Sequence, residues 1–325
     1  MTDITVVYST DYNYLKYAIV SMYSLMKNIR EDCCVNFVLL VPPDMPDSAS
    51  DLITSALSGM SRYTVKLVRV EESFDKAHMA ISHITVTANY RLLLPVLLPE
   101  VSKCIYIDCD TIVTGDVAPL FAEPIGDDYV AGVKAYTFYR NELNTREALG
   151  FTRDEEFVYI NSGVLLLNLE AMRKDDVTSK FMSLINNEYQ CLDQDIINVA
   201  CKGKIRCLPM RYNVMTKYVL FPYKNISAYV SEDEFSEACE RPVVVHFADK
   251  EKPWNNPSVP WAEKWFEYCL APDVWAVLED DERSVLINSI CESSGTYKKE
   301  KLGVIAYLRK FGFKYAVRRF LSGMR

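Results

Sequence analysis

Two acidic residues separated by one position are the sharpest chemical feature of the sequence. Asp108 and Asp110 follow Ile105-Tyr106-Ile107, an apolar run typical of a buried strand. Because side chains alternate along an extended chain, both carboxylates lie on one side if the extended conformation continues past the strand. Carboxylates this close repel each other unless a hard divalent cation lies between them and a ligand's phosphates. The pair therefore predicts a metal site, with a solvated acidic turn as the alternative.

A phosphatase is a second interpretation of the same segment. Asp108-Cys109-Asp110-Thr111-Ile112 after an apolar strand also resembles the nucleophile motif of haloacid dehalogenase-type phosphatases. That motif opens the first strand of its sheet, whereas at least three strand–helix units precede Asp108 here. The sequence also has no later G-D-x-x-x-D segment. The phosphatase is therefore the less favoured alternative.

The residues before Asp108 alternate between strand and helix patterns, which must position the acidic pair. Short β-branched or apolar runs predict strands, and apolar residues at helical spacing predict helices. The predicted strands cover 4–9, 35–41, 64–70 and 103–108, and the predicted helices 14–28, 47–57 and 87–94. This order predicts an α/β fold with a mostly parallel sheet flanked by helices. Ligands of such sheets bind beyond the carboxyl ends of the strands, where the chain order reverses.

Beyond residue 114 the regular alternation breaks. Residues 136–157 are polar and irregular, which predicts a loop or lid. Later apolar runs predict strands over 158–169 and 242–247, and helices from about residue 177 and over 195–201. The chain beyond residue 272 is helical in pattern and more charged. We therefore expect a catalytic domain over 1–270 and a helical extension over 271–325.

Composition excludes several classes of protein. Of the 325 residues, 50% are hydrophobic and 25% are charged, which excludes a disordered chain, a collagen and a coiled coil. No apolar run approaches the length of a membrane span, and a net charge of −8 argues against nucleic acid as a partner. The ten cysteines include no C-x-x-C pair, and the N-terminus lacks an export signal pattern. We expect reduced thiols and a cytoplasmic location.

The last residues have the opposite charge from the acidic body. Residues 297–325 are rich in Lys and Arg, and Val304, Leu308, Phe311 and Tyr315 follow one another at spacings of four, three and four. This pattern predicts a basic amphipathic helix. Such a helix packs either on the acidic body or on an anionic membrane surface, which would make the protein peripheral on the inner face of the membrane.

Six segments, in order from residue 4 to about residue 254, together resemble glycosyltransferase family 8. This family contains bacterial lipopolysaccharide galactosyl- and glucosyltransferases and glycogenin. Each segment alone is a weak signal, and the order of all six makes the resemblance specific. The segments are Tyr8-Ser9-Thr10-Asp11-Tyr12-Asn13-Tyr14, His83-Ile84-Thr85 with Tyr90-Arg91, Tyr106-Ile107-Asp108-Cys109-Asp110, Ile160-Asn161-Ser162-Gly163-Val164-Leu165-Leu166-Leu167-Asn168-Leu169, Asp193-Gln194-Asp195-Ile196-Ile197-Asn198, and His246-Phe247 with Lys252-Pro253-Trp254.

The resemblance implies a fold, an activity and a set of site residues. It implies a nucleotide-diphospho-sugar transferase (GT-A type) fold and a retaining hexosyltransferase that uses UDP-glucose or UDP-galactose, with Mn²⁺ or Mg²⁺ as cofactor and a glycan or glycolipid of the cell surface as acceptor. Asp108, Asp110 and His246 would hold the metal. The resemblance assigns Lys252 to the diphosphate, Thr10, Asp11, Asn13 and Tyr14 to the nucleoside, Arg91 to the sugar or diphosphate, and Asn161, Asp193 and Gln194 to the sugar pocket.

Retention leaves two catalytic roles open. A double displacement needs a carboxylate nucleophile under the sugar, and Asp193 is the available acid. We favour instead attack by the acceptor on the face that the diphosphate leaves, with the amide of Gln194 stabilising positive charge on the sugar. A nucleotide-sugar-binding protein without turnover is the alternative function.

Asp249, Tyr14 and residues 136–157 bear on how far the family resemblance assigns the site. The family has a glycine where this chain has Asp249, and a negative side chain beside a diphosphate is unfavourable unless it points away. Tyr14 either stacks on the uracil or packs on the sheet as a helix-start aromatic residue. Residues 136–157 match no family segment, so the sequence does not indicate the acceptor.

Overall fold

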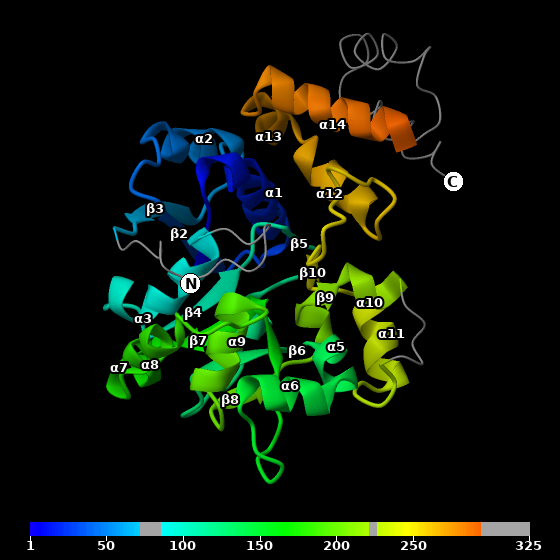
Figure 1. Ribbon diagram of the computed structural model, residues 1–325. Coiled ribbons are helices and arrows are strands. Elements are labelled where there is room, and N and C mark those ends of the chain that lie inside the picture. Colours follow the sequence, from blue (N-terminus) through cyan, green and yellow to red (C-terminus); the bar gives the residue numbers. More distant parts are fainter. Residues whose placement is uncertain (72–85, 221–225, 294–325) are drawn as a thin grey trace.

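The computed structural model describes residues 1–71, 86–220 and 226–293, which form a twisted α/β domain (Figure 1). Its central sheet has seven strands in the order β3-β2-β1-β4-β7-β6-β8. These strands are β1 (Thr2–Ser9), β2 (Cys33–Val41), β3 (Tyr63–Arg69), β4 (Lys103–Ile107), β6 (Val130–Lys134), β7 (Ile160–Asn168) and β8 (Ile205–Cys207). The segment His83-Ile84-Thr85 lies outside the described residues.

The chain order reverses between two neighbouring parallel strands. β1, β2 and β3 run side by side and parallel, and β4 then returns to the other edge of β1, also parallel. β7 pairs antiparallel with β4 and with β6, while β8 is parallel to β6. The sheet is therefore mostly parallel, as predicted. The reversal point lies at the carboxyl ends of β1 and β4, directly before Asp108.

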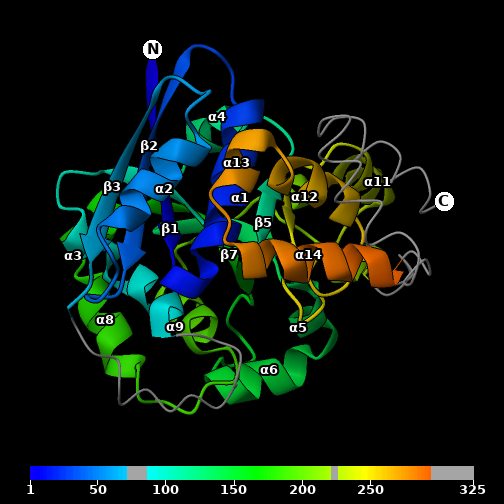
Figure 2. The same ribbon diagram turned by 90° about the horizontal axis from the view of Figure 1, so that it is seen from above.

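Helices cover both faces of the sheet because its central strands are apolar on both sides. Along β1, Ile4, Val6 and Tyr8 belong to one buried cluster and Val7 belongs to the other. Figure 2 shows α2 (Ser48–Ala56) and α13 (Pro272–Ala276) beside α1 (Tyr12–Asn28). The opposite face is covered by a 3₁₀ helix (Val86–Leu93), α3 (Leu94–Leu97), α7 (Leu169–Lys174), α8 (Val177–Leu184) and α9 (Leu192–Ala200).

A small second sheet forms the other side of the site. Its strands are β5 (Thr111–Val113), β10 (Val244–His246) and β9 (Val214–Met215), in the order β5-β10-β9. β5 begins directly after Asp110, and Thr111 pairs with His246 in the antiparallel β5–β10 register. This register brings a histidine from late in the chain next to the acidic pair.

The elements of the second half of the chain agree with the predictions only in part. Residues 136–157 are not an irregular loop, since α5 (Tyr136–Arg140) and α6 (Glu142–Leu149) occupy most of them. Gly150 ends α6 in the left-handed region with φ 70°. The predicted helix over 195–201 begins earlier, so that Asp193 and Gln194 lie in the first turn of α9. The short strands β5, β6, β8 and β9 were not predicted.

The remaining helices frame the small sheet and continue toward the C-terminus. They are α4 (Ala118–Ala122), a 3₁₀ turn (Met210–Tyr212), α10 (Thr216–Leu220), α11 (Glu232–Glu240), α12 (Ala262–Cys269) and α14 (Asp280–Ser293). Val274, Leu278 and Leu286 join the same buried cluster as α1, and Lys16 Nζ lies 2.6 Å from Glu282 Oε1. The described part of the extension is therefore packed on the catalytic body, and a boundary near residue 270 stays a prediction.

Two further predictions concern the thiols and the basic tail. The nine cysteines whose side chains the structure describes are free thiols, as predicted for them. No described helix has both the length and the apolar character that crossing a membrane requires. The predicted amphipathic helix from residue 302 lies outside the described residues.

Candidate active site

A polar cleft of about 470 Å³ opens at the carboxyl ends of β1 and β4. Nine of the predicted site residues line it, and they come from both sheets, from three helical segments and from the loops beside them. These residues are Tyr14, Arg91, Asp108, Asp110, Asn161, Asp193, Gln194, His246 and Lys252. The position agrees with the expectation that ligands bind where the chain order reverses.

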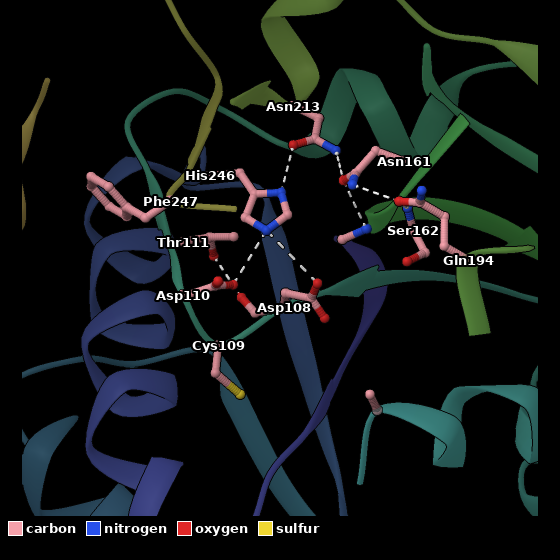
Figure 3. A network of polar contacts seen from close by, with 12 residues as sticks. Asp108, Cys109, Asp110, Thr111, Asn161, Ser162, Gln194, Asn213, His246 and Phe247 are labelled. Carbon is pink, nitrogen blue, oxygen red and sulfur yellow. Dashed lines mark hydrogen bonds and ion pairs between the residues drawn. The ribbon is translucent and has the colours of Figure 1, made fainter. Parts of the chain in front are cut away.

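Three side chains in the cleft form a cluster that could hold a metal ion. Asp108, Asp110 and His246 place one ligand atom each within 4.8 Å of one another (Figure 3). His246 Nε2 lies 3.3 Å from Asp110 Oδ1 and 3.8 Å from Asp108 Oδ2. Backbone hydrogen bonds hold both acidic residues in place. Asp108 N–H donates to Gly163 O at 2.8 Å, and Phe247 N–H donates to Asp110 O at 2.9 Å. The pair has left the strand, yet both carboxylates face the imidazole.

The tautomer of His246 follows from a chain of amide groups. The backbone N–H of Gly163 donates to Asn161 Oδ1 at 3.0 Å, which fixes that atom as an oxygen. Asn213 Nδ2 therefore donates to the same oxygen at 2.8 Å, and Asn213 Oδ1 is left to face His246 Nδ1 at 3.0 Å. His246 must carry its proton on Nδ1, so the lone pair of Nε2 points toward the carboxylates. Asn213, which is fully buried, orients the ring for metal binding.

The same chain of amides continues to Gln194. Gln194 Oε1 accepts from Asn161 Nδ2 at 2.8 Å and from the backbone N–H of Ser162 at 3.2 Å. Gln194 Nε2 donates to the Tyr159 hydroxyl at 2.8 Å, and that hydroxyl donates in turn to Asp195 Oδ1. The side chain predicted to face the sugar is thus locked in one rotamer by three partners.

Gly163 leaves the space that the cluster occupies. A Cβ atom added at this position would lie 2.1 Å from His246 Cε1 and 2.7 Å from Asp108 Oδ2. Real Cβ atoms do not come so close to other atoms, and the buried ring has no room to move aside. The glycine in Asn161-Ser162-Gly163 is therefore a steric requirement of the metal cluster.

A buried arginine links the metal cluster to the sugar pocket. Arg91 Nη2 lies 2.8 Å from Asp108 Oδ1, and its Nε lies 3.2 Å from Asp193 Oδ2. Its guanidinium also stacks on the ring of Tyr106, with 4.2 Å between the guanidinium carbon and the ring centroid. Burial alone would lower the pKa of Arg91, but the two carboxylates raise it above its ordinary value. Arg91 stays charged and holds Asp108 from the side opposite His246.

Asp193 is buried, and the pKa of its carboxyl group is raised. Burial raises the pKa of Asp193 to about 6, although the positive charge of Arg91 opposes this effect. Only 4% of the residue is exposed, and its Oδ2 atom accepts no hydrogen bond from the described residues despite the ion pair with Arg91. The geometry holds Asp193 against Arg91.

Lys252 places a positive charge beside Asp110 in the cleft. Its Nζ lies 2.5 Å from Asp110 Oδ2 and also donates to the carbonyl oxygen of Phe247. Burial would raise the pKa of Asp110, but the positive charge and hydrogen bond of Lys252 and the nearby His246 ring hold it well below its usual range. Asp110 is therefore ionised throughout the physiological range, which suits a metal ligand.

The residues predicted to bind the nucleoside divide into two groups. Tyr14 lines the cleft and packs edge-on against Trp254, whose ring stacks on Tyr17 with centroids 3.7 Å apart. Thr10, Asp11 and Asn13 are not among the lining residues of the described chain. Asp11 instead caps α1, since its Oδ1 accepts from Tyr14 N–H at 2.8 Å. Thr10 is buried and Asn13 is exposed.

Asp249, which stands at the glycine position of the family, lies at the rim of the cleft. Its Oδ1 accepts from the backbone N–H of Lys250 at 2.8 Å. Burial lowers the pKa of Lys217, another lining residue, whereas the negative charge of Asp249 raises it. The charge of Asp249 thus acts on a lysine of the protein.

Sequence reasoning missed several residues of this site. Asn213, Tyr159 and Lys217 have no partner at recognisable spacing, because their contacts form only through the small sheet and α9. Gly163 was quoted as part of a motif without a role. The sequence around Asp108 and Asp110 gives no sign that the backbone of Gly163 approaches them so closely.

The architecture of the chain is the GT-A type fold of glycosyltransferases. Among solved structures, the galactosyltransferase LgtC in complex with donor and acceptor sugar analogs has a TM-score of 0.70 and 22% identity, and the match covers 87% of this chain and 100% of that chain. This likeness shows the fold.

Sequence comparisons narrow the class to one family. The model of glycosyl transferase family 8 matches residues 5–257. General stress protein A of Bacillus subtilis (strain 168) is 28% identical over 273 residues, which are 81% of this chain and 92% of that protein. A lipopolysaccharide 1,2-glucosyltransferase of Escherichia coli (strain K12) is 25% identical over 304 residues, 91% of this chain and 84% of that protein. The chain belongs to glycosyltransferase family 8, which replaces the phosphatase alternative.

Proposed function

We propose that the protein transfers a hexose from UDP-glucose or UDP-galactose to a hydroxyl of a glycan acceptor, with retention at the anomeric carbon. The cluster of Asp108, Asp110 and His246 inside the cleft carries this proposal. The similarity to a lipopolysaccharide 1,2-glucosyltransferase supports an acceptor in lipopolysaccharide, capsule or another surface glycan. The acceptor would be presented at the cytoplasmic membrane face, to which the predicted basic tail would bring the enzyme.

The donor set of the cluster fits a divalent metal ion. Two carboxylates and an imidazole whose Nε2 lone pair faces them suit Mn²⁺ better than Mg²⁺, which prefers oxygen ligands only. The space left by Gly163 is what keeps the three ligand atoms within reach of one ion. A divalent ion supplies charge stabilisation to the diphosphate that leaves the sugar.

The charged side chains around the cluster orient the donor. Lys252 offers its ammonium group to the diphosphate, and Arg91 holds Asp108 in place from behind. Tyr14 and Trp254 form an aromatic wall on which a uracil ring can stack. Contacts from Thr10, Asp11 and Asn13 to the nucleoside remain part of the proposal, with Asp11 also capping α1.

We favour attack of the acceptor hydroxyl on the face that the diphosphate leaves. Asp193 is ion-paired with Arg91, which lowers its availability as a nucleophile. Gln194, an amide, is a poor nucleophile but is rigidly held by Asn161, Ser162 and Tyr159. A fixed dipole beside the anomeric carbon stabilises positive charge without having to reorganise.

Release of UDP from UDP-glucose and UDP-galactose, with and without glycan acceptors, tests this function. We expect turnover with Mn²⁺, none in EDTA, and recovery when Mn²⁺ is restored. Asp110→Asn keeps the size of the side chain but removes a charge, so turnover should fall by at least ~10². Asp51→Asn, on the exposed face of α2, is the matched control and should leave turnover unchanged.

Two outcomes would contradict the proposal. Full turnover in EDTA would exclude the metal site as part of the mechanism. Tight UDP-sugar binding without UDP release for any acceptor would favour the alternative, a nucleotide-sugar-binding protein.

A further inference from the structure

A second cavity lies beside the cleft, on the far side of α5. It has a volume of about 480 Å³ and lies between α5, α6 and the segment that leads into α9. In Figure 1, α5 and α6 lie on the opposite side of the small sheet from α1. The residues that matter for its chemistry are Phe138, Asn141, Asn144, Tyr189, Gln190 and Asp195.

The lining of this cavity combines polar and apolar side chains, and its described residues carry no positive charge. None of the described residues that line it is Lys, Arg or His. The side-chain amides of Asn141, Asn144 and Gln190 make no hydrogen bond within the described chain, so their donors and acceptors are free for a ligand. Phe138 and Tyr189 add half-buried aromatic surface.

This combination selects a neutral, polyhydroxylated ligand. Amides pair with sugar hydroxyls because each amide offers both donors and acceptors, and aromatic rings cover the apolar face of a sugar ring. A phosphate or carboxylate group would find no cationic side chain among the described lining residues, and the acidic side chains of Glu188 and Asp195 would repel it. The volume lies within the range of small-molecule sites in proteins.

Two side chains connect the second cavity to the active site. Phe138 lines both cavities, and its ring stacks on Tyr159 with centroids 4.3 Å apart. The Tyr159 hydroxyl bonds Gln194, which faces the cleft, and Asp195, which lines the second cavity. The cavity therefore borders the sugar end of the cleft, away from the aromatic wall of Tyr14 and Trp254.

We propose that the second cavity is a subsite for a sugar residue of the acceptor glycan, beyond the residue whose hydroxyl reacts. The proposal rests on the proposed function, since it assigns part of that same acceptor. With this subsite the enzyme binds longer glycans more tightly, because an oligosaccharide makes contacts that a single sugar cannot make. Contacts worth ~1.4 kcal/mol would correspond to a tenfold difference in Kd.

Filling the cavity tests the subsite directly. Ala148 lines it from the exposed side of α6, so Ala148→Trp should occupy the space without disturbing the core. Leu143→Trp is the matched control, because Leu143 is 75% exposed on the same helix and does not line the cavity. Saturation-transfer NMR with UDP and Mg²⁺ present would measure binding of methyl glucoside, methyl galactoside, lactose, maltose and maltotriose.

We expect the wild-type protein and the Leu143→Trp variant to bind at least one di- or trisaccharide. Ala148→Trp should weaken that binding about tenfold and leave the methyl glycosides unchanged. Equal oligosaccharide binding by both variants would overturn the subsite, and so would the absence of saturation transfer to all five sugars with wild-type protein. UDP release measured in parallel separates the two proposals. Normal UDP release by the wild type, together with equal oligosaccharide binding by wild type and Ala148→Trp, contradicts the subsite alone.

Discussion

The two cavities on either side of Phe138 are organised in opposite ways. In the cleft, charged groups of both signs are paired with each other: Arg91 with Asp108 and Asp193, and Lys252 with Asp110. In the second cavity, the amides of Asn141, Asn144 and Gln190 are left without protein partners in the described chain. The charged groups of the cleft are preorganised by one another, whereas the amides of the second cavity have hydrogen-bonding groups that are open to a ligand.

The difference follows from what each site has to recognise. A diphosphate and a metal ion carry charges whose stabilisation depends on fixed, preorganised groups. The cleft achieves this because two backbone N–H groups, those of Ser162 and Gly163, anchor the amides that orient Gln194 and His246. A neutral sugar demands less precision, so exposed amides on α6 and before α9 are sufficient.

Removing the space at Gly163 should produce the largest effect. Gly163→Ala places a Cβ against His246 and Asp108, which must separate, and a displacement of about 1 Å in a catalytic group can cost ~10² in rate. We expect at least this loss of UDP release, with a folded protein by circular dichroism. Gly59→Ala is the control, since its new Cβ meets only the side chain of Asp273 at 3.3 Å. Near-normal turnover in Gly163→Ala would refute the rigid-cluster account.

A smaller effect should separate the roles of Gln194 and Asp193. If the Gln194 amide stabilises charge, Gln194→Ala should lower kcat about tenfold to a hundredfold with little change in donor KM, and the product should keep its anomeric configuration. Steady-state kinetics and NMR of the product measure both. A hexose adduct on Asp193, detected by intact mass in this variant or in the wild type, would overturn the same-face mechanism.

The smallest effect concerns the pH dependence of stability. With the pKa of Asp193 raised to about 6, the folded protein binds this proton more tightly than the unfolded chain, so the contribution to stability is lost as pH rises toward and through 6. Asp193→Asn, which cannot ionise, should gain on the order of 1 kcal/mol relative to wild type between pH 5 and pH 7.5. Urea unfolding at the two pH values measures this difference, and a constant difference would contradict the raised pKa.

Sequence alone predicted the parts of the site that directly follow strands along the chain. The Asp108–Asp110 spacing and the apolar strand before it indicated a metal site, and the alternating pattern of the first half predicted the mostly parallel sheet. His246 came from the family resemblance, and the β5–β10 register explains its position beside Asp110.

Other parts depend on contacts that no local pattern encodes. Asn213 orients His246 only because β9 lies parallel to β10, and Tyr159 reaches Gln194 and Asp195 only because α9 packs against β7. Helix α6 did leave a signal, since Gly150 stands directly after its last residue, but its polar surface hid the helical period. Asp11 was assigned to the nucleoside, and its capping of α1 was overlooked.

Binding of Mn²⁺ tests the central claim most directly, because it reads the cluster without requiring an acceptor. The signal of free Mn²⁺ in electron paramagnetic resonance would be followed as protein is added in the presence of UDP. The proteins compared are the wild type, Asp110→Asn, Asn213→Ala and the control Asn36→Ala. Asn36 is remote from the cleft, and its side-chain amide accepts a hydrogen bond from Thr64. We predict one bound ion in wild type and in the control, a loss of binding in Asp110→Asn, and an affinity ten- to a hundredfold lower in Asn213→Ala. Equal Mn²⁺ binding by wild type and Asp110→Asn would contradict the account.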